Sequence, residues 1–279
     1  MVCVLAHPDD ESFSVGGTIA LYAKNGWNIT LVVVTNGEKG SSGDFHIESV
    51  QDLGIKRQEE VEKAALVLGI KHVEFLNFPD AGLKQLVPGT LEDALFPLIK
   101  QILPDIVITH DPTGITNHPD HIKVCYSTTY AFQKYAAYLQ SLSQVDTMTK
   151  GRGKEWKQFE YQRAFGDTKN ISKEPKLYYV CLSQSSIDFL LKEKFIPEES
   201  FEKPWKGTPD KNITTIIDIT PTMLQKGKAL LCHETQAEKV DQFISFVKNP
   251  EVKQECFVLR MQGVYEVFMS KADRYSDAL

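Results

Sequence analysis

Short apolar runs alternate with helix-length segments through the first half of the chain. The runs are apolar almost throughout and rich in β-branched residues, which is typical of strands buried on both faces of a parallel sheet. Such runs predict strands over Val2–Ala6, Asn28–Thr35, Lys71–Leu76 and Asp105–Thr109. The segments between them predict helices over about Val15–Lys24, Ile55–Leu68 and Leu91–Leu103. This alternation predicts an α/β fold, with a mostly parallel sheet covered by helices on both faces.

The pattern changes in the middle of the chain. From Leu139 to Lys176 the sequence is rich in Gln, Lys and aromatic residues and has no clean periodicity. We expect an insertion there that forms a lid or a contact between subunits of a homo-oligomer. After it, the pattern predicts strands over Leu177–Leu182 and Ile213–Ile219. It then predicts helices over Thr222–His233 and Ala237–Val247.

These elements predict one domain over 1–279. It comprises a Rossmann-like core over 1–138, the insertion over 139–176, and a C-terminal α/β extension over 177–279 that completes the domain. Leu68-Gly69 and Asn25-Gly26 fit as helix ends, because glycine commonly follows the last helical residue.

Composition and charge narrow the function classes. The chain is 42% hydrophobic and 24% charged, as in ordinary globular proteins. Its net charge is −6 and no segment carries a basic run, which disfavours nucleic-acid binding. No stretch approaches the roughly 18 apolar residues of a membrane span, so we expect no membrane insertion. The five cysteines are widely spaced and mostly lie in apolar runs, which is typical of reduced thiols in a cytoplasmic protein.

Chemistry-bearing side chains follow directly after two of the expected strands. The first strand leads into His7-Pro8-Asp9-Asp10-Glu11, and the fourth leads into His110 and then His118-Pro119-Asp120-His121. In the usual doubly wound order these two strands are neighbours, and ligands bind at the carboxyl edge between them. We therefore expect the two loops to meet at one crevice.

Each loop alone has a simpler interpretation, because His-Pro-Asp often forms a turn in which Asp caps a helix. Together, however, the carboxylates and histidines would repel one another or be poorly solvated unless a cation lay among them. Two histidines and one carboxylate leave positions open for water and substrate, as a catalytic metal site requires. The sequence thus predicts a divalent metal, with zinc preferred and Fe²⁺ left open as an ion that accepts the same ligands.

Several motifs in order resemble those of a known family. They are Ala-His-Pro-Asp-Asp-Glu at 6–11, Gly-Gly-Thr at 16–18, Thr-Asn-Gly-Glu at 35–38, Arg57 before Glu59-Glu60, Phe-Pro-Asp at 78–80 and His-Pro-Asp-His at 118–121. On these motifs the chain is similar to the LmbE-like, PIG-L-type N-acetylglucosaminyl deacetylases. The resemblance is strong to about residue 130 and then thins to 218–220 and 228–236.

The resemblance implies a zinc-dependent hydrolase that removes the N-acetyl group from an N-acetylglucosamine-containing small molecule or glycoconjugate. It also implies roles for six residues of the two loops. These are His7, Asp10 and His121 as metal ligands, Asp9 as general base, His118 as a second acid or oxyanion stabiliser, and Asp120 as the residue that orients His118. Mycothiol-type relatives have a Tyr where this chain has Thr116, so we expect His118 to stabilise the oxyanion alone.

Three further residues are expected to bind substrate: Arg57, Glu38 and His233. Each has a plainer interpretation, as a surface ion pair, a loop residue or a helix-end histidine favoured by the dipole. Glu11 is expected to cap a helix, and His110 to pack behind the ligands rather than to bind metal.

Two other function classes were compared with the deacetylase. A nucleotide-binding protein is disfavoured, because carboxylates follow the first strand and G-x-G-x-x-G is absent. A metal-binding relative with another amide substrate, or with a non-catalytic binding role, stays open. The resemblance also leaves the substrate open among N-acetylglucosamine linked to inositol, phosphatidylinositol or malate, and chitin disaccharides.

Overall fold

One sheet of eight strands organises the chain. The computed structural model describes residues 1–148, 174–245, 253–267 and 276–279. The strands of the sheet are β1 Val2–Leu5, β2 Thr30–Thr35, β3 His72–Phe78, β4 Ile106–His110, β5 Lys176–Cys181, β8 Thr215–Asp218, β9 Gln254–Gln262 and β10 Tyr265–Glu266. They run in the order β10-β9-β5-β4-β1-β2-β3, and β8 also pairs with β9.

The sheet has a parallel centre and an antiparallel edge. Strand β1 pairs in parallel with β2 and β4, and β5 pairs in parallel with β4. Strand β9 is antiparallel to β5, and β8 and β10 are antiparallel to β9. The mostly parallel α/β fold predicted from the sequence is confirmed. The first and fourth strands are neighbours as expected, with Val4 opposite Thr109.

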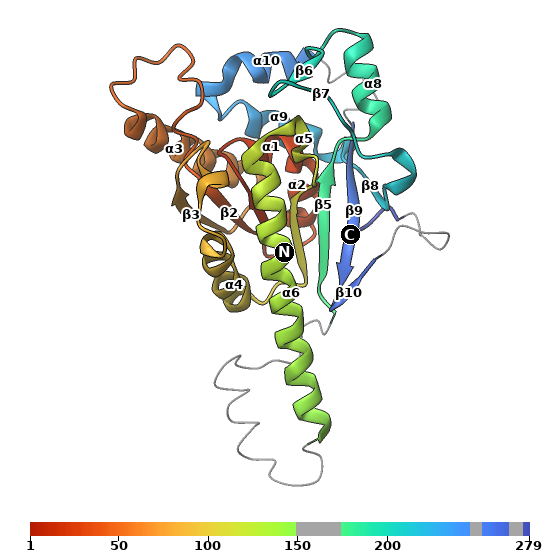
Figure 1. Cartoon of the computed structure of the whole chain (residues 1–279). Coiled ribbons are helices and arrows are strands. Elements are labelled where there is room, and N and C mark those ends of the chain that lie inside the picture. Colours follow the sequence, from red (N-terminus) through yellow and green to blue (C-terminus); the bar gives the residue numbers. More distant parts are fainter. Residues whose placement is uncertain (149–173, 246–252, 268–275) are drawn as a thin grey trace.

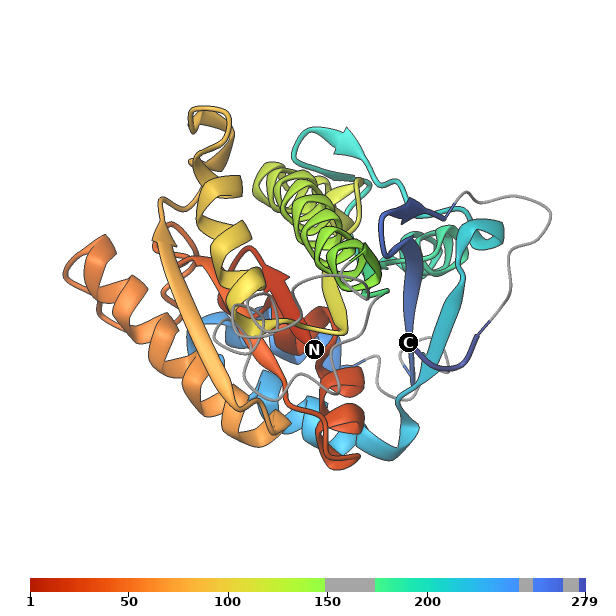
Figure 2. The same cartoon turned by 90° about the horizontal axis from the view of Figure 1, so that it is seen from below.

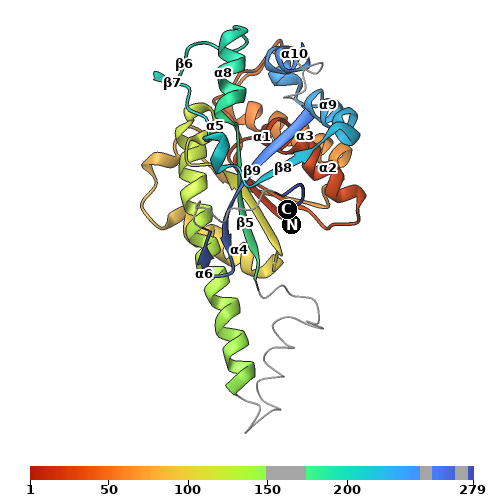
Figure 3. The same ribbon diagram turned by 90° about the vertical axis from the view of Figure 1, so that its right-hand side faces the viewer.

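Helices cover both faces of this sheet (Figure 3). They are α1 Asp10–Ser14, α2 Gly16–Lys24, α3 Val50–Leu68, α4 Thr90–Ile102, α5 Gly114–Asn117, α6 Pro119–Met148, α8 Gln184–Lys192, α9 Met223–Leu230 and α10 Ala237–Ser245. Short 3-10 turns occur at η1 Leu83–Gln85, η3 Asp210–Asn212, η4 Thr220–Thr222 and η5 Glu234–Gln236. Helices α4 and α6 lie on one face, and α2, α3 and α9 lie on the other, as the view along the sheet also shows (Figure 2).

Alternate residues of each strand enter two separate cores. In β1, Val2 and Val4 pack with the α4 and α6 side, whereas Cys3 and Leu5 pack with the α2 and α3 side. All four are fully buried, which explains why the strand is apolar at every position. Helix α3 ends where Gly69 adopts a φ of 81°, as expected from its sequence.

The second half of the chain departs from the sequence prediction in several places. Residues 139–148 are not the start of an irregular insertion but the end of the long helix α6. The expected insertion otherwise falls on 149–173, outside the described residues. Helix α8 and strand β9 were not predicted, because short apolar runs fit a helix and a strand equally well.

Several C-terminal elements lie above the edge of the sheet at which the parallel strands end (Figure 1). They are α8, α10 and a small hairpin made of β6 Glu199–Ser200 and β7 Lys203–Pro204. They stand above the edge at which the first and fourth strands end. Every helix in the described part of the chain is too short or too polar to cross a bilayer.

Candidate metal centre

The first polar loop begins where β1 ends. Asp9 precedes α1 with a φ of 117°, a left-handed conformation that is strained for a residue with a side chain. Its carboxylate makes no capping bond to the helix. It instead accepts a hydrogen bond of 3.1 Å from Nη2 of Arg57. The side chain of Asp9 is therefore directed toward the loop cluster rather than to the helix end.

The second polar loop begins where β4 ends at His110. Gly114 has a φ of 72°, and a Cβ there would lie 2.8 Å from Ile122. This close approach lets the Gly114 carbonyl lie 3.1 Å from Nδ1 of His121, in the first turn of α6. Because Nδ1 faces a carbonyl, the proton belongs on Nδ1 and leaves Nε2 as the free donor atom for a metal.

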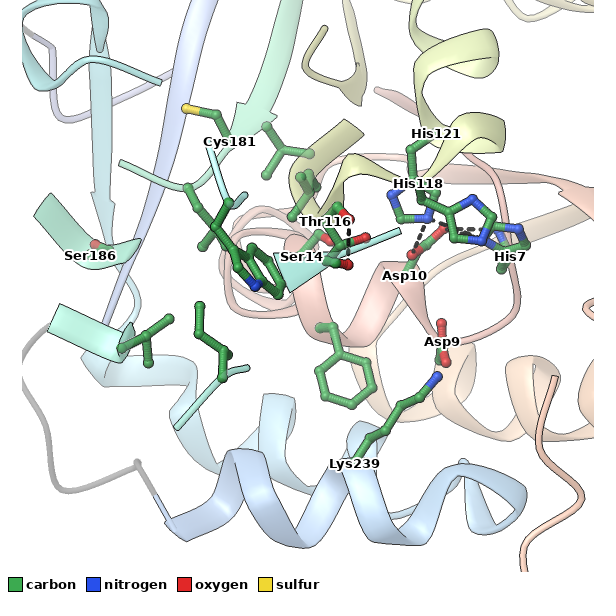
Figure 4. Close-up of a pocket in the computed structure, with 18 of the residues that line it drawn as sticks. His7, Asp9, Asp10, Ser14, Thr116, His118, His121, Cys181, Ser186 and Lys239 are labelled. Carbon is green, nitrogen blue, oxygen red and sulfur yellow. Dashed lines mark hydrogen bonds and ion pairs between the residues drawn. The ribbon is translucent and has the colours of Figure 1, made fainter. Parts of the chain in front are cut away.

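Three side chains present donor atoms to a common point (Figure 4). Nδ1 of His7 lies 3.0 Å from Nε2 of His121 and 3.6 Å from Oδ2 of Asp10. Nε2 of His121 lies 3.3 Å from Oδ1 of Asp10. Ligand atoms around a tetrahedral ion with bonds of about 2.0–2.1 Å lie roughly 3.3 Å apart. Each of the two nitrogens thus lies within 3.6 Å of one oxygen of the Asp10 carboxylate, and these spacings suit the ligands of one divalent ion.

Further contacts within the protein orient the side chains of His7 and Asp10. Nε2 of His7 lies 3.3 Å from Oδ1 of Asp80 and 3.5 Å from Oδ2 of Asp120. Oδ2 of Asp10 accepts a 2.8 Å hydrogen bond from the backbone N–H of His7 and lies 3.3 Å from Nε2 of His110. Carboxylates behind ligand histidines fix ring orientation and strengthen the ligand.

The electrostatics of this cluster favour a cation. Burial alone would lower the pKa of His7, but the surrounding carboxylates, Asp10 first, raise it well above its usual value. Burial would likewise raise the pKa of Asp10, but His121 and His110 lower it strongly. Three overlapping groups of donor atoms lie within 4.8 Å of one another, namely His7, His118 and His121; Asp10, His110 and His121; and His7, Asp80 and Asp120. Positive charge is thus stabilised at this point of the structure.

Asp9 stands next to these candidate donor atoms in a buried setting. Burial raises the pKa of its carboxyl, while Arg57 acts in the opposite direction. The same guanidinium donates to the carbonyls of Gly37 and Pro8. The backbone N–H of Asp9 donates to Oε2 of Glu11 at 3.2 Å. Arg57 and Glu11 thus hold the side chain and the backbone of Asp9 from two directions.

His118 is oriented by backbone rather than by a carboxylate. Its Nδ1 accepts a 3.1 Å hydrogen bond from the backbone N–H of Asp120. The Asp120 carboxylate lies elsewhere, against His7 and the N–H of Leu83, and not against His118 as expected. Burial, followed by the charges of His7 and His121, lowers the pKa of His118 to about 3. His118 is therefore a neutral imidazole with its proton on Nε2.

The three residues expected to bind substrate lie in different places. Arg57 lines the cavity beside Asp9. Glu38 does not line it, and its Oε1 accepts a 2.9 Å hydrogen bond from the N–H of Asp80. His233 is fully buried, with Nε2 at 2.7 Å from Oε1 of Glu11, rather than at the rim. Hydrogen bonds to Asp80 and to Glu11 thus hold Glu38 and His233 outside the cavity lining.

Sequence reasoning assigned no role to Asp80 and only a minor one to Glu11. Asp80 follows β3, whose carboxyl end meets the same edge as those of β1 and β4. That position was the available signal, because carboxyl ends of parallel strands converge. For Glu11 the signal is weaker, since its partner His233 lies 222 residues away.

A cavity of about 750 Å³ opens from the cluster. We call one side of it the polar end, formed by His7, Asp9, Asp10, Arg57, His118 and His121. We call the other side the apolar end, formed by Leu182, Phe189, Leu190, Phe195, Ile196 and Trp205. Figure 4 shows the labelled polar residues on one side, with Cys181 and Ser186 across the cavity and Lys239 reaching toward Asp9.

The β6–β7 hairpin is fastened to the loop that carries His118. Oγ of Ser200 donates to the carbonyl of Thr116 at 2.7 Å. Nδ2 of Asn117 lies 3.1–3.4 Å from three hairpin carbonyls. At the hairpin tip, the Phe201 ring stands edge-on to His118 with centroids 4.5 Å apart. The hairpin therefore places an aromatic ring at the boundary between the two ends.

Comparison with known families adds a sequence match over the first half of the chain. The family model described as GlcNAc-PI de-N-acetylase matches residues 2–132. The 1D-myo-inositol 2-acetamido-2-deoxy-alpha-D-glucopyranoside deacetylase of Thermobifida fusca is 30% identical over 257 residues, which span 85% of this chain and 82% of that protein. The match to this relative therefore extends over both halves of the chain.

Solved structures share the fold at low sequence identity. The N,N'-diacetylchitobiose deacetylase from Pyrococcus horikoshii is similar with a TM-score of 0.59 and 20% identity, covering 92% of this chain and 81% of that one. GalB, the 4-carboxy-2-hydroxymuconate hydratase from Pseudomonas putida, has a TM-score of 0.56 and 19% identity, covering 97% and 98%. Since a hydratase shares the fold, the fold alone does not assign the reaction.

Proposed function

This chain belongs to the PIG-L, or LmbE-like, family of N-acetylglucosaminyl deacetylases. From that premise we propose which residues carry out the reaction and which class of substrate they act on. It is a hydrolase of an N-acetyl amide bond, and its substrate is an N-acetylglucosamine-containing small molecule or glycoconjugate. The observation that carries the proposal is the triangle of donor atoms from His7, Asp10 and His121, with Asp9 and His118 beside it.

The proposed metal ligands are His7, Asp10 and His121. The two histidine nitrogens lie 3.0 Å apart and 3.3–3.6 Å from the Asp10 carboxylate oxygens, and Nδ1 of His121 faces the Gly114 carbonyl. Two nitrogens and one carboxylate oxygen suit zinc and also Fe²⁺, and zinc is the ion we propose. A bound divalent ion supplies Lewis acidity, which makes a water more acidic and polarises the acetyl carbonyl.

Asp9 is the proposed general base. Its carboxylate is buried beside the ligands, and burial raises its pKa toward the range useful for proton transfer. It takes a proton from the water whose oxygen attacks the acetyl carbonyl carbon. As the C–N bond breaks, the amine nitrogen must gain a proton, and Asp9 returns the one it has taken. Acetic acid and a free amine are the products, and the proton of the acid then passes to the amine or to solvent.

His118 is the proposed oxyanion donor. Because its Nδ1 accepts the Asp120 N–H, its Nε2 carries the proton and can donate to a negatively charged oxygen. A neutral imidazole, in agreement with its lowered pKa, still provides this Nε2–H donor. Asp120 contributes twice, by its backbone N–H to His118 and by its carboxylate to His7.

Arg57 is the proposed residue that positions the base. It is buried and donates to Asp9 and to two carbonyls of the surrounding loops. Glu38 contacts Asp80 and His233 contacts Glu11, so neither residue reaches the cavity directly. We therefore propose positioning roles for these two residues in place of substrate contact.

The test is release of free amine from a panel of N-acetylglucosaminides after metal removal and reconstitution. We expect no activity after chelation and recovery with zinc, with iron(II) run in parallel. His7→Ala should lose both metal and activity, whereas His72→Ala, at an exposed position of β3, should keep both. Full amine release by a protein that elemental analysis finds free of metal would refute the proposed metal centre.

A further inference from the structure

The wall of the cavity opposite the metal cluster comes from a different part of the chain. Its residues follow β5, line α8 and continue to the β6–β7 hairpin, all between residues 180 and 205. The family model ends at residue 132, so this wall lies outside the matched segment. The family model therefore does not describe this end of the cavity, although the match to the Thermobifida fusca relative extends over both halves of the chain.

Large apolar side chains dominate this wall. Leu182, Phe189, Leu190, Phe195, Ile196 and Trp205 all line the cavity, and each is only half-buried in the structure. Half-exposed leucine, isoleucine and aromatic side chains gathered in one concave site are the usual lining of a pocket for an apolar ligand group.

The charged pair beside this wall is satisfied within the protein. Nζ of Lys226 donates to Oε1 of Glu255 at 2.6 Å and to the carbonyl of Phe13 at 2.8 Å. The Glu255 carboxylate also accepts the backbone N–H groups of Gly17 and Thr18 at 2.9 and 2.8 Å. Both side chains are nearly fully buried. This ion pair is thus committed to holding α2, α9 and β9 together.

The hydroxyl groups at the start of α8 are likewise engaged. Ser183 accepts the N–H of Ser186, caps the helix and bonds to the Ser186 hydroxyl at 2.6 Å. Among the described residues, the buried Nε1 of Trp205 is the polar atom of the apolar end that has no partner. A group bound there would thus meet one unpartnered donor beside mainly apolar side chains, with Gln254 as a further polar side chain of the cavity lining.

Two cations of the cavity lie toward its polar end, whereas Lys226 is paired with Glu255 beside the apolar wall. Arg57 contacts Asp9, and Lys239 points toward Asp9 in Figure 4. A polyol such as inositol at the apolar end would exchange its hydrogen bonds with water for contacts with hydrocarbon, which weakens binding. An alkyl or aryl group there would leave water, and each buried methylene increases affinity by up to about fourfold.

We propose that the apolar end binds an apolar aglycone, an alkyl or aryl group joined to the N-acetylglucosamine whose acetyl group lies at the polar end. The inference rests on the proposed deacetylase function and narrows its substrate to amphipathic glycosides. The sugar would lie at the Phe201 ring, which stands between the two ends and against His118. The inositol conjugate named for the Thermobifida fusca relative is then the poorer ligand.

The binding test uses zinc-loaded Asp9→Asn protein, which retains the cavity but lacks the base. Calorimetry would compare methyl and hexyl N-acetylglucosaminides of both anomers, and N-acetylglucosaminyl-inositol, below their micelle concentrations. The hexyl glycoside has five more methylenes than the methyl glycoside. If each contributes about twofold, which is half of the upper limit of about fourfold, the better hexyl anomer should bind at least 30-fold more tightly than its methyl counterpart. The inositol conjugate should bind no better than the methyl glycoside. Equal binding of hexyl and methyl glycosides, or tightest binding of the inositol conjugate, would overturn the inference.

Two neighbouring leucines provide a matched control. Leu190 lines the cavity, whereas Leu191, next to it on α8 and also half-buried, does not. Leu190→Gln should reduce the hexyl-to-methyl preference at least tenfold, and Leu191→Gln should leave it within twofold. Ile196→Thr gives a second, smaller change outside α8 in case Leu190→Gln does not fold. An unchanged preference in folded Leu190→Gln and Ile196→Thr would overturn the inference as well.

Activity of the wild-type chain separates the two proposals. If methyl and hexyl glycosides are deacetylated with the same kcat/KM, the deacetylase function stands and the apolar aglycone site falls. If Asp9→Asn protein prefers the hexyl glycoside but the zinc-loaded wild type releases no amine from any glycoside, the proposed function falls and the apolar site stands.

Discussion

The polar end of the cavity comes from two short loops and from Arg57 of α3, all in the N-terminal half of the chain, whereas its apolar end comes from residues 180–205. At the polar end nearly every side chain is fixed by a named partner, as Asp9 is by Arg57 and His121 by Gly114. At the apolar end the large side chains are half-buried and bounded by hydrocarbon. The difference indicates that one end is arranged for chemistry and the other for selection of the substrate.

This comparison predicts two kinds of variant. Changes at the polar end should lower kcat for every glycoside by the same factor, because the chemical step is common to all of them. Changes at the apolar end should alter the ratio between glycosides and leave kcat for the smallest one near the wild-type value. The predictions below test that division at the polar end, from the largest effect to the smallest.

Asp9→Ala removes the proposed base while leaving the apolar end intact. We expect kcat to fall by about 10²- to 10⁴-fold, the usual contribution of a general base. Bound zinc, measured by elemental analysis, should stay near one ion per chain. Asp93→Ala, at an exposed position on α4, is the control and should be fully active. An active Asp9→Ala enzyme would remove the base from the mechanism.

His118→Ala removes the proposed oxyanion donor. We expect kcat to fall by about 10²- to 10³-fold, as on removal of one such donor in other hydrolases. The loss should be equal for methyl and hexyl glycosides in steady-state assays, and metal content should not change. His46→Ala, away from the cavity, serves for comparison. A loss confined to one glycoside would mean that His118 selects the substrate instead.

Gly37→Ala tests whether the placement of Arg57 sets the base. A Cβ at Gly37, whose φ is 64°, would clash with the Arg57 guanidinium. We expect displacement of Arg57 to lower kcat about tenfold, corresponding to about 1.4 kcal/mol of transition-state stabilisation. Gly26 also has a positive φ, of 86°, but nothing lies within 4 Å of its Cβ position.

Gly26→Ala therefore controls for backbone strain without the clash. It should lower the melting temperature to a similar degree and leave kcat unchanged. If both glycine variants lose activity equally, the effect comes from strain, and the role of Arg57 in positioning Asp9 is wrong.

The buried His233–Glu11 pair predicts a pH dependence of stability. Burial alone would lower the pKa of His233, but Glu11 raises it, and His233 correspondingly lowers the pKa of Glu11 against the effect of its burial. A raised histidine pKa stabilises the fold fully below its ordinary value of 6.5, and that stabilisation disappears as pH rises through the folded-state pKa. A lowered glutamate pKa stabilises above 4.5, and its contribution is lost as pH falls.

His233→Gln should therefore lower the melting temperature most between about pH 4.5 and 6.5 and less at pH 9. Thermal melts across this range provide the measurement, with the exposed His72→Gln as control. A difference that is the same at every pH would mean that packing, and not the charge pair, accounts for the effect.

Much of the fold and part of the site could be predicted from the sequence. The buried strands β1, β2 and β4 are apolar throughout, and a pattern of that kind has few alternatives. The second half was harder, because the apolar runs within α8 and β9 are short and fit a helix and a strand alike. The long helix α6 also continues through residues 139–148, where polar and aromatic residues hide its period.

The sequence by itself determined which loops hold the chemistry. The residues of His-Pro-Asp-Asp and His-Pro-Asp-His follow strands directly, and parallel strand order then brings the two loops to one edge. No contact between distant side chains is needed for that inference. It depends on local pattern and on a general rule of α/β topology.

Only the tertiary structure decided what each side chain touches. His233 contacts Glu11 and does not reach the cavity, and Glu38 accepts a hydrogen bond from the backbone N–H of Asp80. The Asp120 carboxylate faces His7 instead of His118. The apolar end has no motif, because residues scattered over 180–205 become a wall only when α8 and the hairpin pack over the sheet edge. Contacts of this kind depend on the relative positions of elements distant in sequence, to within about an ångström. The hydrophobic pattern of the sequence does not encode those positions.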